Sequence, residues 1–163
     1  MILYHGSYKA IKKPDLSFSR LRTDFGKGFY LTPLKEQAML WSQRFLREQG
    51  KAVITYYEFL TGQDDRMPPE LKIMEFNTYS LEWLNFITSC RLGHNVDTDW
   101  DLIIGGVAND KVFDTLQLYF DSLIGAEEAI GRLRFNKPNL QYCFKKQTLI
   151  DSYLRVIDFQ EIK

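Results

Sequence analysis

The chain is short of the residues on which thiol and metal chemistry most often depend. Its two cysteines, Cys90 and Cys143, lie far apart and have no CxxC neighbour, so we expect both to be buried, reduced thiols. Its two histidines, His5 and His94, form no ligand-spaced cluster, so we expect no metal site. The same scarcity disfavours a Cys–His catalytic pair.

Long apolar runs and an excess of charge of one sign are also missing. No stretch approaches the roughly 18 uninterrupted apolar residues of a membrane-spanning helix. The N-terminus MILYHGSYKA lacks the basic region and the long apolar core of a signal peptide. The 21 basic residues balance 21 acidic ones, which gives no global case for binding a nucleic-acid backbone. We therefore expect a cytoplasmic protein without membrane contact.

The chain does have enough apolar sequence for one packed domain. Hydrophobic residues make up 45% of its 163 residues, which fits a single domain over residues 1–163. The patterning predicts strands at 1–7, 26–32, 52–60, 101–109 and 140–146. It predicts helices at 32–50, 81–93, 110–124 and 125–135, and then a helical or irregular start and an edge strand within 147–162. Strands and helices mix without a strict βαβ rhythm, so the expected fold class is α+β.

The helix expected at 32–50 carries clear signals at both ends. Thr32 can cap its start, Pro33 suits its first position, and Gly50 ends it. Apolar residues at helical spacing predict an inward-facing stripe, which consists of Leu34, Ala38, Trp41 and Phe45.

Two features are candidates for ligand contacts, and each has a plainer interpretation beside it. His5 stands at a strand end next to Gly6, where a side chain can meet a ligand or can simply bond a nearby turn. Tyr30 and Trp41, eleven positions apart, could face each other across a flat cationic ring, or could both pack in the core. Judged alone, both features favour the plainer interpretation.

Taken in order, these segments resemble the ADP-ribosyltransferase superfamily. YHGS at 4–7 is similar to the first-strand motif whose histidine binds the nicotinamide ribose. FGKGFYLTPLKEQAMLW at 25–41 is similar to the stretch whose two tyrosines, eleven apart, sandwich nicotinamide. NLQYCF at 139–144 is similar to the late strand that carries the catalytic glutamate. Three motifs in the right order shift the balance towards the functional interpretation.

The resemblance implies a role for each matching residue. It makes His5, Tyr30 and Gln141 the catalytic set, with glutamine where the superfamily usually has glutamate. Glutamine keeps the hydrogen bond to the ribose 2′-hydroxyl but loses the charge that stabilises the transition state. Asp24 or Asp110 could bring a carboxylate to the cleft through space. The residues implied in NAD binding are His5, Gly6, Ser7, Arg20, Phe25, Gly28, Tyr30 and Trp41. For Arg20 the pyrophosphate is the implied partner, and a solvated surface position is the equal alternative.

Nearly the whole chain also resembles a bacterial family of unknown function numbered 3990, through LYHGS, DFGKGFYLT, DLIIGGVAND and LQYCF. Together the resemblances imply a split β-sandwich of two small antiparallel sheets with peripheral helices, and NAD as co-substrate without a metal. They imply a mono-ADP-ribosyltransferase that modifies a protein or a nucleic acid, as the toxin of a toxin–antitoxin pair with a small antitoxin protein as partner. The alternatives are a weak or inactive module that binds NAD or ADP-ribose, and an NAD glycohydrolase.

Overall fold

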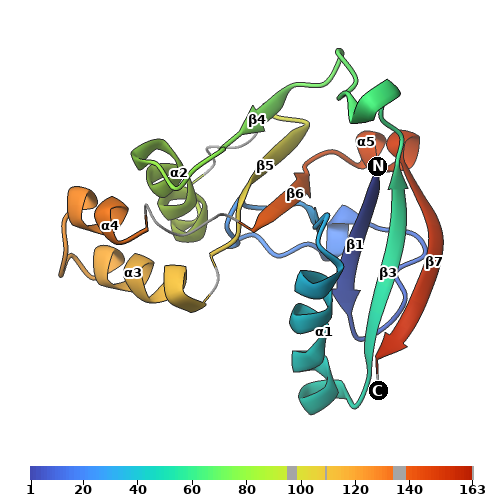
Figure 1. The fold of residues 1–163 in the computed structure, drawn as a ribbon, viewed down its shortest axis with the longest axis horizontal. Coiled ribbons are helices and arrows are strands. Elements are labelled where there is room, and N and C mark those ends of the chain that lie inside the picture. The colour runs from blue at the N-terminus through green and yellow to red at the C-terminus, as the bar shows by residue number, and fades with distance from the viewer. Residues whose placement is uncertain (95–98, 109, 134–138, 163) are drawn as a thin grey trace.

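Two small sheets form the framework of the computed structural model, which describes residues 1–94, 99–108, 110–133 and 139–162 (Figure 1). The three-stranded sheet has the order β1–β3–β7, with bounds Ile2–Ser7, Ala52–Phe59 and Leu154–Ile162. The four-stranded sheet has the order β2–β6–β5–β4, with bounds Phe29–Leu31, Leu140–Phe144, Leu102–Gly106 and Ile73–Glu75. These two sheets confirm the expected α+β class.

In the described part of the chain, five α-helices surround the sheets, together with two short 3₁₀ helices at Leu16–Phe18 and Gln63–Asp65. The α-helices are α1 Lys35–Gln49, α2 Leu81–Leu92, α3 Asp110–Phe120, α4 Ala126–Leu133 and α5 Gln147–Tyr153. In Figure 1, α2, α3 and α4 gather on the left, and the three-stranded sheet stands on the right. Each predicted helix and strand has a counterpart here. Asn109 and the last two residues predicted for the helix at 125–135 lie outside the described residues.

The pairing of β4 with β5 corrects the prediction that both sheets are antiparallel. Ile73 lies opposite Leu102 and Glu75 opposite Ile104 in a parallel register, whereas the other neighbouring strands pair antiparallel. Helix α2 connects the two strands, and a crossover of this kind returns the chain in the direction that parallel pairing needs. β4 is three residues long, and the sequence patterning predicts no strand there.

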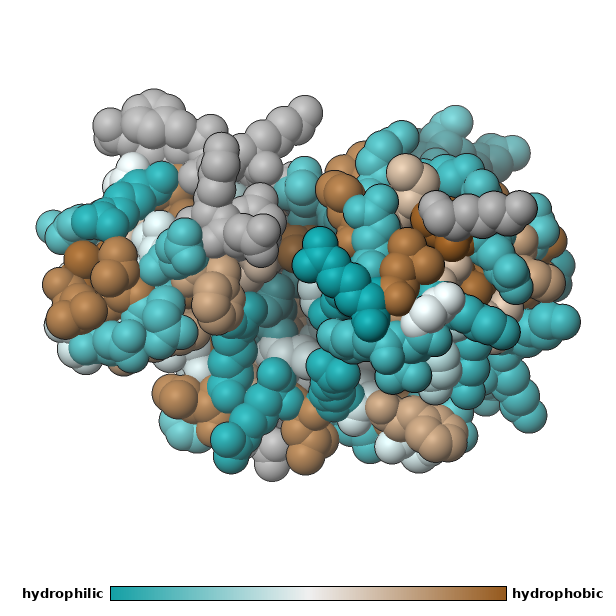
Figure 2. All heavy atoms as spheres, turned by 90° about the horizontal axis from the view of Figure 1, so that it is seen from below, coloured by the Kyte–Doolittle hydropathy of each residue, from teal (hydrophilic) through white to brown (hydrophobic). Residues whose placement is uncertain are grey.

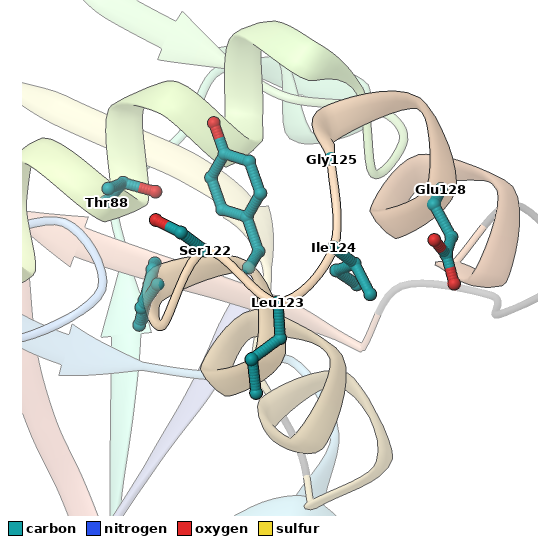
Figure 3. A pocket seen from close by; sticks show the side chains of 8 residues that line it. Thr88, Ser122, Leu123, Ile124, Gly125 and Glu128 are labelled. Carbon is teal, nitrogen blue, oxygen red and sulfur yellow. The ribbon is translucent and has the colours of Figure 1, made fainter.

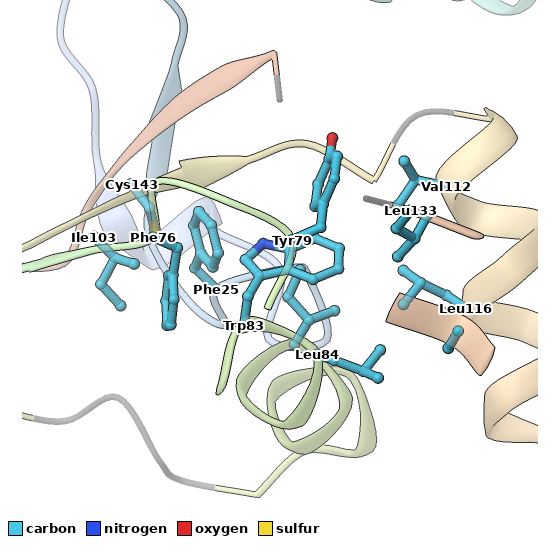
Figure 4. Close-up of a cluster of buried hydrophobic side chains, with 12 residues drawn as sticks. Phe25, Phe76, Tyr79, Trp83, Leu84, Ile103, Val112, Leu116, Leu133 and Cys143 are labelled. Atoms are coloured by element: carbon cyan, nitrogen blue, oxygen red, sulfur yellow. The ribbon is translucent and has the colours of Figure 1, made fainter. Parts of the chain in front are cut away.

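Each face of the four-stranded sheet has its own hydrophobic core, because successive residues of a strand point to opposite faces. Ile104 of β5 belongs to the core between the two sheets, which also contains Leu3, Tyr57, Phe59, Phe144 and Ile150. Ile103 belongs to the core against α2, α3 and α4, which also contains Phe25, Phe76, Trp83, Leu116 and Cys143 (Figure 4). Cys90 and Cys143 are both buried and not disulfide-bonded, as predicted.

Helix α1 lies against β1 more closely than its apolar stripe predicts. A Cβ placed on Gly6 would come within 2.3 Å of the Ala38 carbonyl oxygen and 3.1 Å of the Ser42 Cβ. At that separation only small side chains fit beneath the helix, so its buried residues are Ala38 and Ser42. The prediction that Trp41 faces inward is therefore wrong: its side chain is 52% exposed. Leu34, 42% exposed, is outside the buried face for the same reason.

The start of α1 also differs from the prediction, whereas its end agrees. The helix begins at Lys35 after Leu34, and Leu34 makes no side-chain cap. Thr32 instead accepts the Leu34 N–H at 3.1 Å and donates to the Leu140 carbonyl at 3.0 Å, which joins the β2 side of the sheet to β6. Gly50 ends the helix in the left-handed conformation (φ 68°). Within the described residues, no helix combines the length and the apolar character needed to span a membrane.

Candidate functional site

Three strands from different parts of the chain bring the predicted site together. Tyr4 of β1 and Thr32 after β2 exchange backbone hydrogen bonds of 2.8 and 3.0 Å, which link the two sheets at this point. β2 then pairs with β6, where Tyr30 lies opposite Cys143. Gln141 is two residues from Cys143, so it shares the sheet face of Tyr30. The positions of His5, Tyr30 and Gln141 therefore lie on the adjacent segments β1, β2 and β6.

The His5 ring is held by the backbone of β2. Its Nδ1 lies 2.8 Å from the Tyr30 carbonyl oxygen, and its ring centroid lies 4.7 Å from that of Phe29. A carbonyl only accepts hydrogen bonds, so Nδ1 carries the proton and the neutral ring keeps Nε2 as an acceptor. Burial lowers the His5 pKa, the hydrogen bond to Tyr30 opposes this, and the charge of Arg44 lowers it further. His5 is therefore neutral at physiological pH.

The Tyr30 side chain is anchored by the turn that precedes its own strand. Its hydroxyl donates to the Gly26 carbonyl at 2.7 Å, accepts the Phe25 N–H at 3.0 Å and lies 2.8 Å from Thr23 Oγ1. Its ring stacks on Phe25, with centroids 6.5 Å apart and planes 15° from parallel. Burial raises the Tyr30 pKa well above its ordinary value, so the phenol stays protonated. This ring is fixed before any ligand binds.

Gln141 is buried and bonded to Asp24, a residue that the sequence only suggested. Its Nε2 donates to Asp24 Oδ2 at 3.0 Å and lies 3.4 Å from the Gly106 carbonyl. Asp24 also forms a salt bridge with Arg91, and it accepts the Ala108 N–H at 3.2 Å. The carboxylate that Asp24 brings to the site is thus already paired. The side chain of Asp110, the other acid suggested by the sequence, lies outside the described part.

Trp41 carries a cation on its ring instead of facing Tyr30 in a closed sandwich. The guanidinium carbon of Arg44 lies 3.5 Å from the centroid of the Trp41 ring. Among the described residues, no ring contact joins Tyr30 and Trp41. Burial and the charge of Arg20 lower the pKa of Arg44, and Glu48 opposes them. The charge of Arg44 in turn helps to lower the pKa of His5. Sequence reasoning missed Arg44, whose position one helical turn after Trp41 was the available signal.

The remaining predicted residues divide between backbone and core roles. Backbone N–H and C=O groups alternate sides along a strand, so those of Gly6 face the same edge of β1 as the Tyr4 groups that bond Thr32. Ser7 is buried on the face of His5. A Cβ on Gly28 would lie 2.2 Å from Cys143 Sγ, so Gly28 allows close packing on β6.

Phe25 is fully buried, in contrast to the contact expected with NAD. It lies in the core with Phe76 and Tyr30, and a Cβ on Gly105 would come within 2.9 Å of its ring. Its carbonyl accepts a hydrogen bond from Lys145 Nζ at 2.6 Å. The structure therefore gives Phe25 the role of a support behind Tyr30, not of a surface for a ligand.

An open depression of about 500 Å³ lies elsewhere, between α2 and the turn that joins α3 to α4 (Figure 3). Thr88, Ser122, Leu123 and Glu128 are among the eight residues that line it, and none of the eight belongs to the predicted site. On the face shown in Figure 2, hydrophobic residues form separate patches among hydrophilic ones. In the described ranges, no group of three or more His, Cys, Asp or Glu residues could hold a metal ion.

Comparison with known proteins gives one match. The family model described as "Protein of unknown function (DUF3990)" matches residues 1–156. No curated protein and no solved structure matches the chain. The match covers the strands that carry His5, Tyr30 and Gln141.

Proposed function

The chain belongs to the DUF3990 family of proteins of unknown function, and we propose that it is a mono-ADP-ribosyltransferase with NAD as co-substrate. One observation carries the proposal: β1, β2 and β6 are adjacent, and they hold the histidine, tyrosine and glutamine of the expected signature. The hydrogen bond between His5 and the Tyr30 backbone joins two of these residues directly.

His5 acts as a hydrogen-bond acceptor for a ribose hydroxyl. Its Nδ1–H is used by the Tyr30 carbonyl, so Nε2 is the nitrogen that can accept. A neutral ring suits this role better than a charged one, because an imidazolium has no acceptor. The neighbouring Arg44 charge and the burial of the ring both favour the neutral form. Fixing one hydroxyl orients the ribose for bond cleavage, which is catalysis by positioning.

Gln141 accepts a second ribose hydrogen bond. Its Nε2 faces Asp24, so Oε1 is the atom of this side chain that can accept from the 2′-hydroxyl. NAD supplies a cationic nicotinamide, which leaves as a neutral molecule with the electrons of its bond to ribose while the acceptor group attacks the ribose carbon. An amide oxygen stabilises the resulting positive charge less than a carboxylate does, so slow mono-transfer is the expected chemistry.

Arg44, which acts electrostatically on His5, and Arg20, which acts on Arg44, suit an anionic ligand. Burial is the main cause of the lowered pKa of Arg44, and the charge of Arg20 lowers it further, so the two cations repel each other. A pyrophosphate placed between them would remove that repulsion and accept bidentate hydrogen bonds. The exposed Trp41 ring fixes the Arg44 guanidinium, so its part in binding is to support that cation.

The experiment is to incubate purified protein and a bacterial lysate with NAD labelled on the adenylate phosphate. We expect label in a discrete protein or nucleic-acid band, and a loss of roughly 100-fold or more in a Gln141→Ala variant. His5→Asn is the matched control for geometry, because its amide can still donate to the Tyr30 carbonyl while the Nε2 acceptor is removed. It should fold normally and transfer little label.

Other outcomes of this experiment would distinguish the alternative functions. Bound NAD without label transfer or nicotinamide release would reject the transferase and leave a binding module, which the uncharged Gln141 favours. Nicotinamide release without a labelled macromolecule would indicate an NAD glycohydrolase.

A toxin role, with a small antitoxin protein as partner, is tested by growth. We expect expression in bacteria to slow growth and His5→Asn to relieve the effect. Equal growth with both proteins would reject the toxin role without bearing on the chemistry.

A further inference from the structure

Asp24 holds the side chain of Gln141 from a segment 117 positions away in the sequence. Its Oδ1 binds the Arg91 guanidinium through two nitrogens, at 2.5 and 3.0 Å. Its Oδ2 accepts the Gln141 Nε2 at 3.0 Å and the Ala108 N–H at 3.2 Å. Both oxygens of this carboxylate are therefore engaged, and its side chain is only 12% exposed.

This arrangement requires a donor at position 141. The two acceptors beside the Gln141 amide nitrogen are Asp24 Oδ2 and the Gly106 carbonyl. An amide nitrogen has two hydrogens and can serve both. An ionised glutamate has no hydrogen to donate, so it would set two carboxylates against each other in a buried site.

We propose that Asp24 is a positioning residue for Gln141, and that its carboxylate is the reason why this chain has glutamine at that position. Asp24 orients the amide so that Oε1, not Nε2, is presented to the ligand. The orienting role in turnover rests on the proposed function, whereas the dependence of position 141 on Asp24 does not. The residue types at positions 24 and 141 therefore depend on each other: aspartate goes with glutamine, and asparagine goes with glutamate.

The pair is tested by a double-mutant cycle on the full chain, read by urea unfolding. Gln141→Glu alone should raise the unfolding equilibrium constant roughly tenfold or more. Asp24 Oδ2 loses the Gln141 Nε2 donor, and the new carboxylate faces Asp24 and the Gly106 carbonyl instead. Asp24→Asn alone should also destabilise, since it weakens the ion pair with Arg91. In the Gln141→Glu protein, however, Asp24→Asn should recover part of the lost stability, because the asparagine Nδ2 can donate to the new carboxylate. The recovery is partial, because that nitrogen cannot accept the Ala108 N–H and the new carboxylate still faces the Gly106 carbonyl.

Asp101→Asn is the matched control. Asp101 also pairs with a cation, Lys146, and accepts a backbone N–H, that of Lys72, at a similar exposure of 16%. No hydrogen bond between Asp101 and Gln141 is found among the described residues, so its effect should be the same in both backgrounds. If Asp24→Asn also changes the stability by the same amount in the wild-type and Gln141→Glu backgrounds, the proposal is overturned.

Two further outcomes keep the test decisive. If Gln141→Glu does not fold, the double variant must regain a cooperative unfolding transition, and a double variant that is also unfolded overturns the proposal. Gln141→Met, which removes the donor without adding charge, should be more stable than Gln141→Glu, and the reverse order also overturns it.

Nicotinamide release by the same variants separates this inference from the proposed function. The double variant should release nicotinamide at least tenfold faster than Gln141→Glu at equal folded concentration, since the Asp24→Asn change reorients residue 141. A restored stability without restored turnover, in the presence of wild-type activity, would overturn the orienting role. If neither the wild type nor any variant releases nicotinamide, but the unfolding cycle still shows coupling between positions 24 and 141, only the proposed transferase activity is rejected.

Discussion

The His5 side chain links the proposed chemistry to the stability of the fold. Its Nδ1–H bonds the carbonyl of a neighbouring strand, and its neutral form is favoured by burial and by Arg44. The same bond fixes the tautomer and leaves Nε2 available to a ligand. His5 therefore adds a side-chain bond to the backbone bridge between Tyr4 and Thr32, and it sets the hydrogen-bonding character of the site.

We predict a pH dependence of stability that comes from His5. Its folded pKa is below the ordinary 6.5, so the unfolded chain binds the proton more readily than the folded one. The contribution of neutral His5 to the free energy of unfolding is complete above pH 6.5. It is lost as the pH falls from there through the folded pKa, by at most about 1.4 kcal/mol per pH unit. Urea unfolding from about pH 7.5 to 5.5 should show a shallower loss for His5→Asn than for wild type. Equal slopes would contradict the prediction.

Tyr30 gives a second prediction at this scale. Tyr30→Phe removes a hydroxyl that bonds Phe25 and Gly26, and it should lower the free energy of unfolding by about 1–3 kcal/mol. Tyr79→Phe is the comparison, because among the described residues its hydroxyl has one hydrogen-bond partner, the Val107 carbonyl at 3.0 Å. Denaturant unfolding of both variants should show the larger loss for Tyr30→Phe. A smaller loss would mean that the turn at 23–28 does not depend on this anchor.

At the scale of elements, the contact between α1 and β1 decides which residues reach the surface. Gly6 brings the helix so close that small residues occupy the contact. Trp41 is consequently displaced to the exposed side, where its ring lies under Arg44. The helical spacing of the apolar residues correctly indicated a helix, but the stripe that packs was set by the partner strand.

Gly6→Ala tests this contact. The new Cβ would lie 2.3 Å from a backbone carbonyl of α1, which cannot rotate away, so we expect a loss of about 1–3 kcal/mol or more. Gly131→Ala in α4 is the control, because its Cβ would have no atom within 4 Å. That change should be neutral or should stabilise by up to about 1 kcal/mol. Thermal or urea unfolding measures both, and similar losses would refute the close approach at Gly6.

At the scale of the whole molecule, the four-stranded sheet is shared by two cores. The residues of β5 alternate between them, so neither core can unfold without exposing this strand. This sharing, together with the backbone bridge from Tyr4 to Thr32, supports the expectation of a single domain. Each core depends on apolar side chains from segments that lie far apart in the sequence.

Two neighbouring substitutions test that sharing. Ile103→Ala and Ile104→Ala each remove a buried side chain from a different core, and each should cost about 2–5 kcal/mol. Fluorescence and far-ultraviolet circular dichroism should follow one coincident transition in both variants. Separate transitions, or a variant that loses α2–α4 alone, would show that the two cores are independent units.

The sequence alone determined the features that depend on local preferences. Hydrophobic periodicity and end signals predicted the helices and every described strand except β4, and Gly50 marked the end of α1. The resemblance in three motifs selected His5, Tyr30 and Gln141 before their proximity was known. These features could be predicted because backbone propensity and side-chain alternation act within a few residues.

Only the tertiary structure decided the rest. The parallel pairing of β4, the exposure of Trp41 and the burial of Phe25 depend on which surfaces meet, and no local pattern encodes that. The bond between Asp24 and Gln141 depends on a meeting of a loop and a strand 117 residues apart. Burial and pairing are properties of neighbours in space, so the chemical meaning of the glutamine becomes visible only beside its carboxylate.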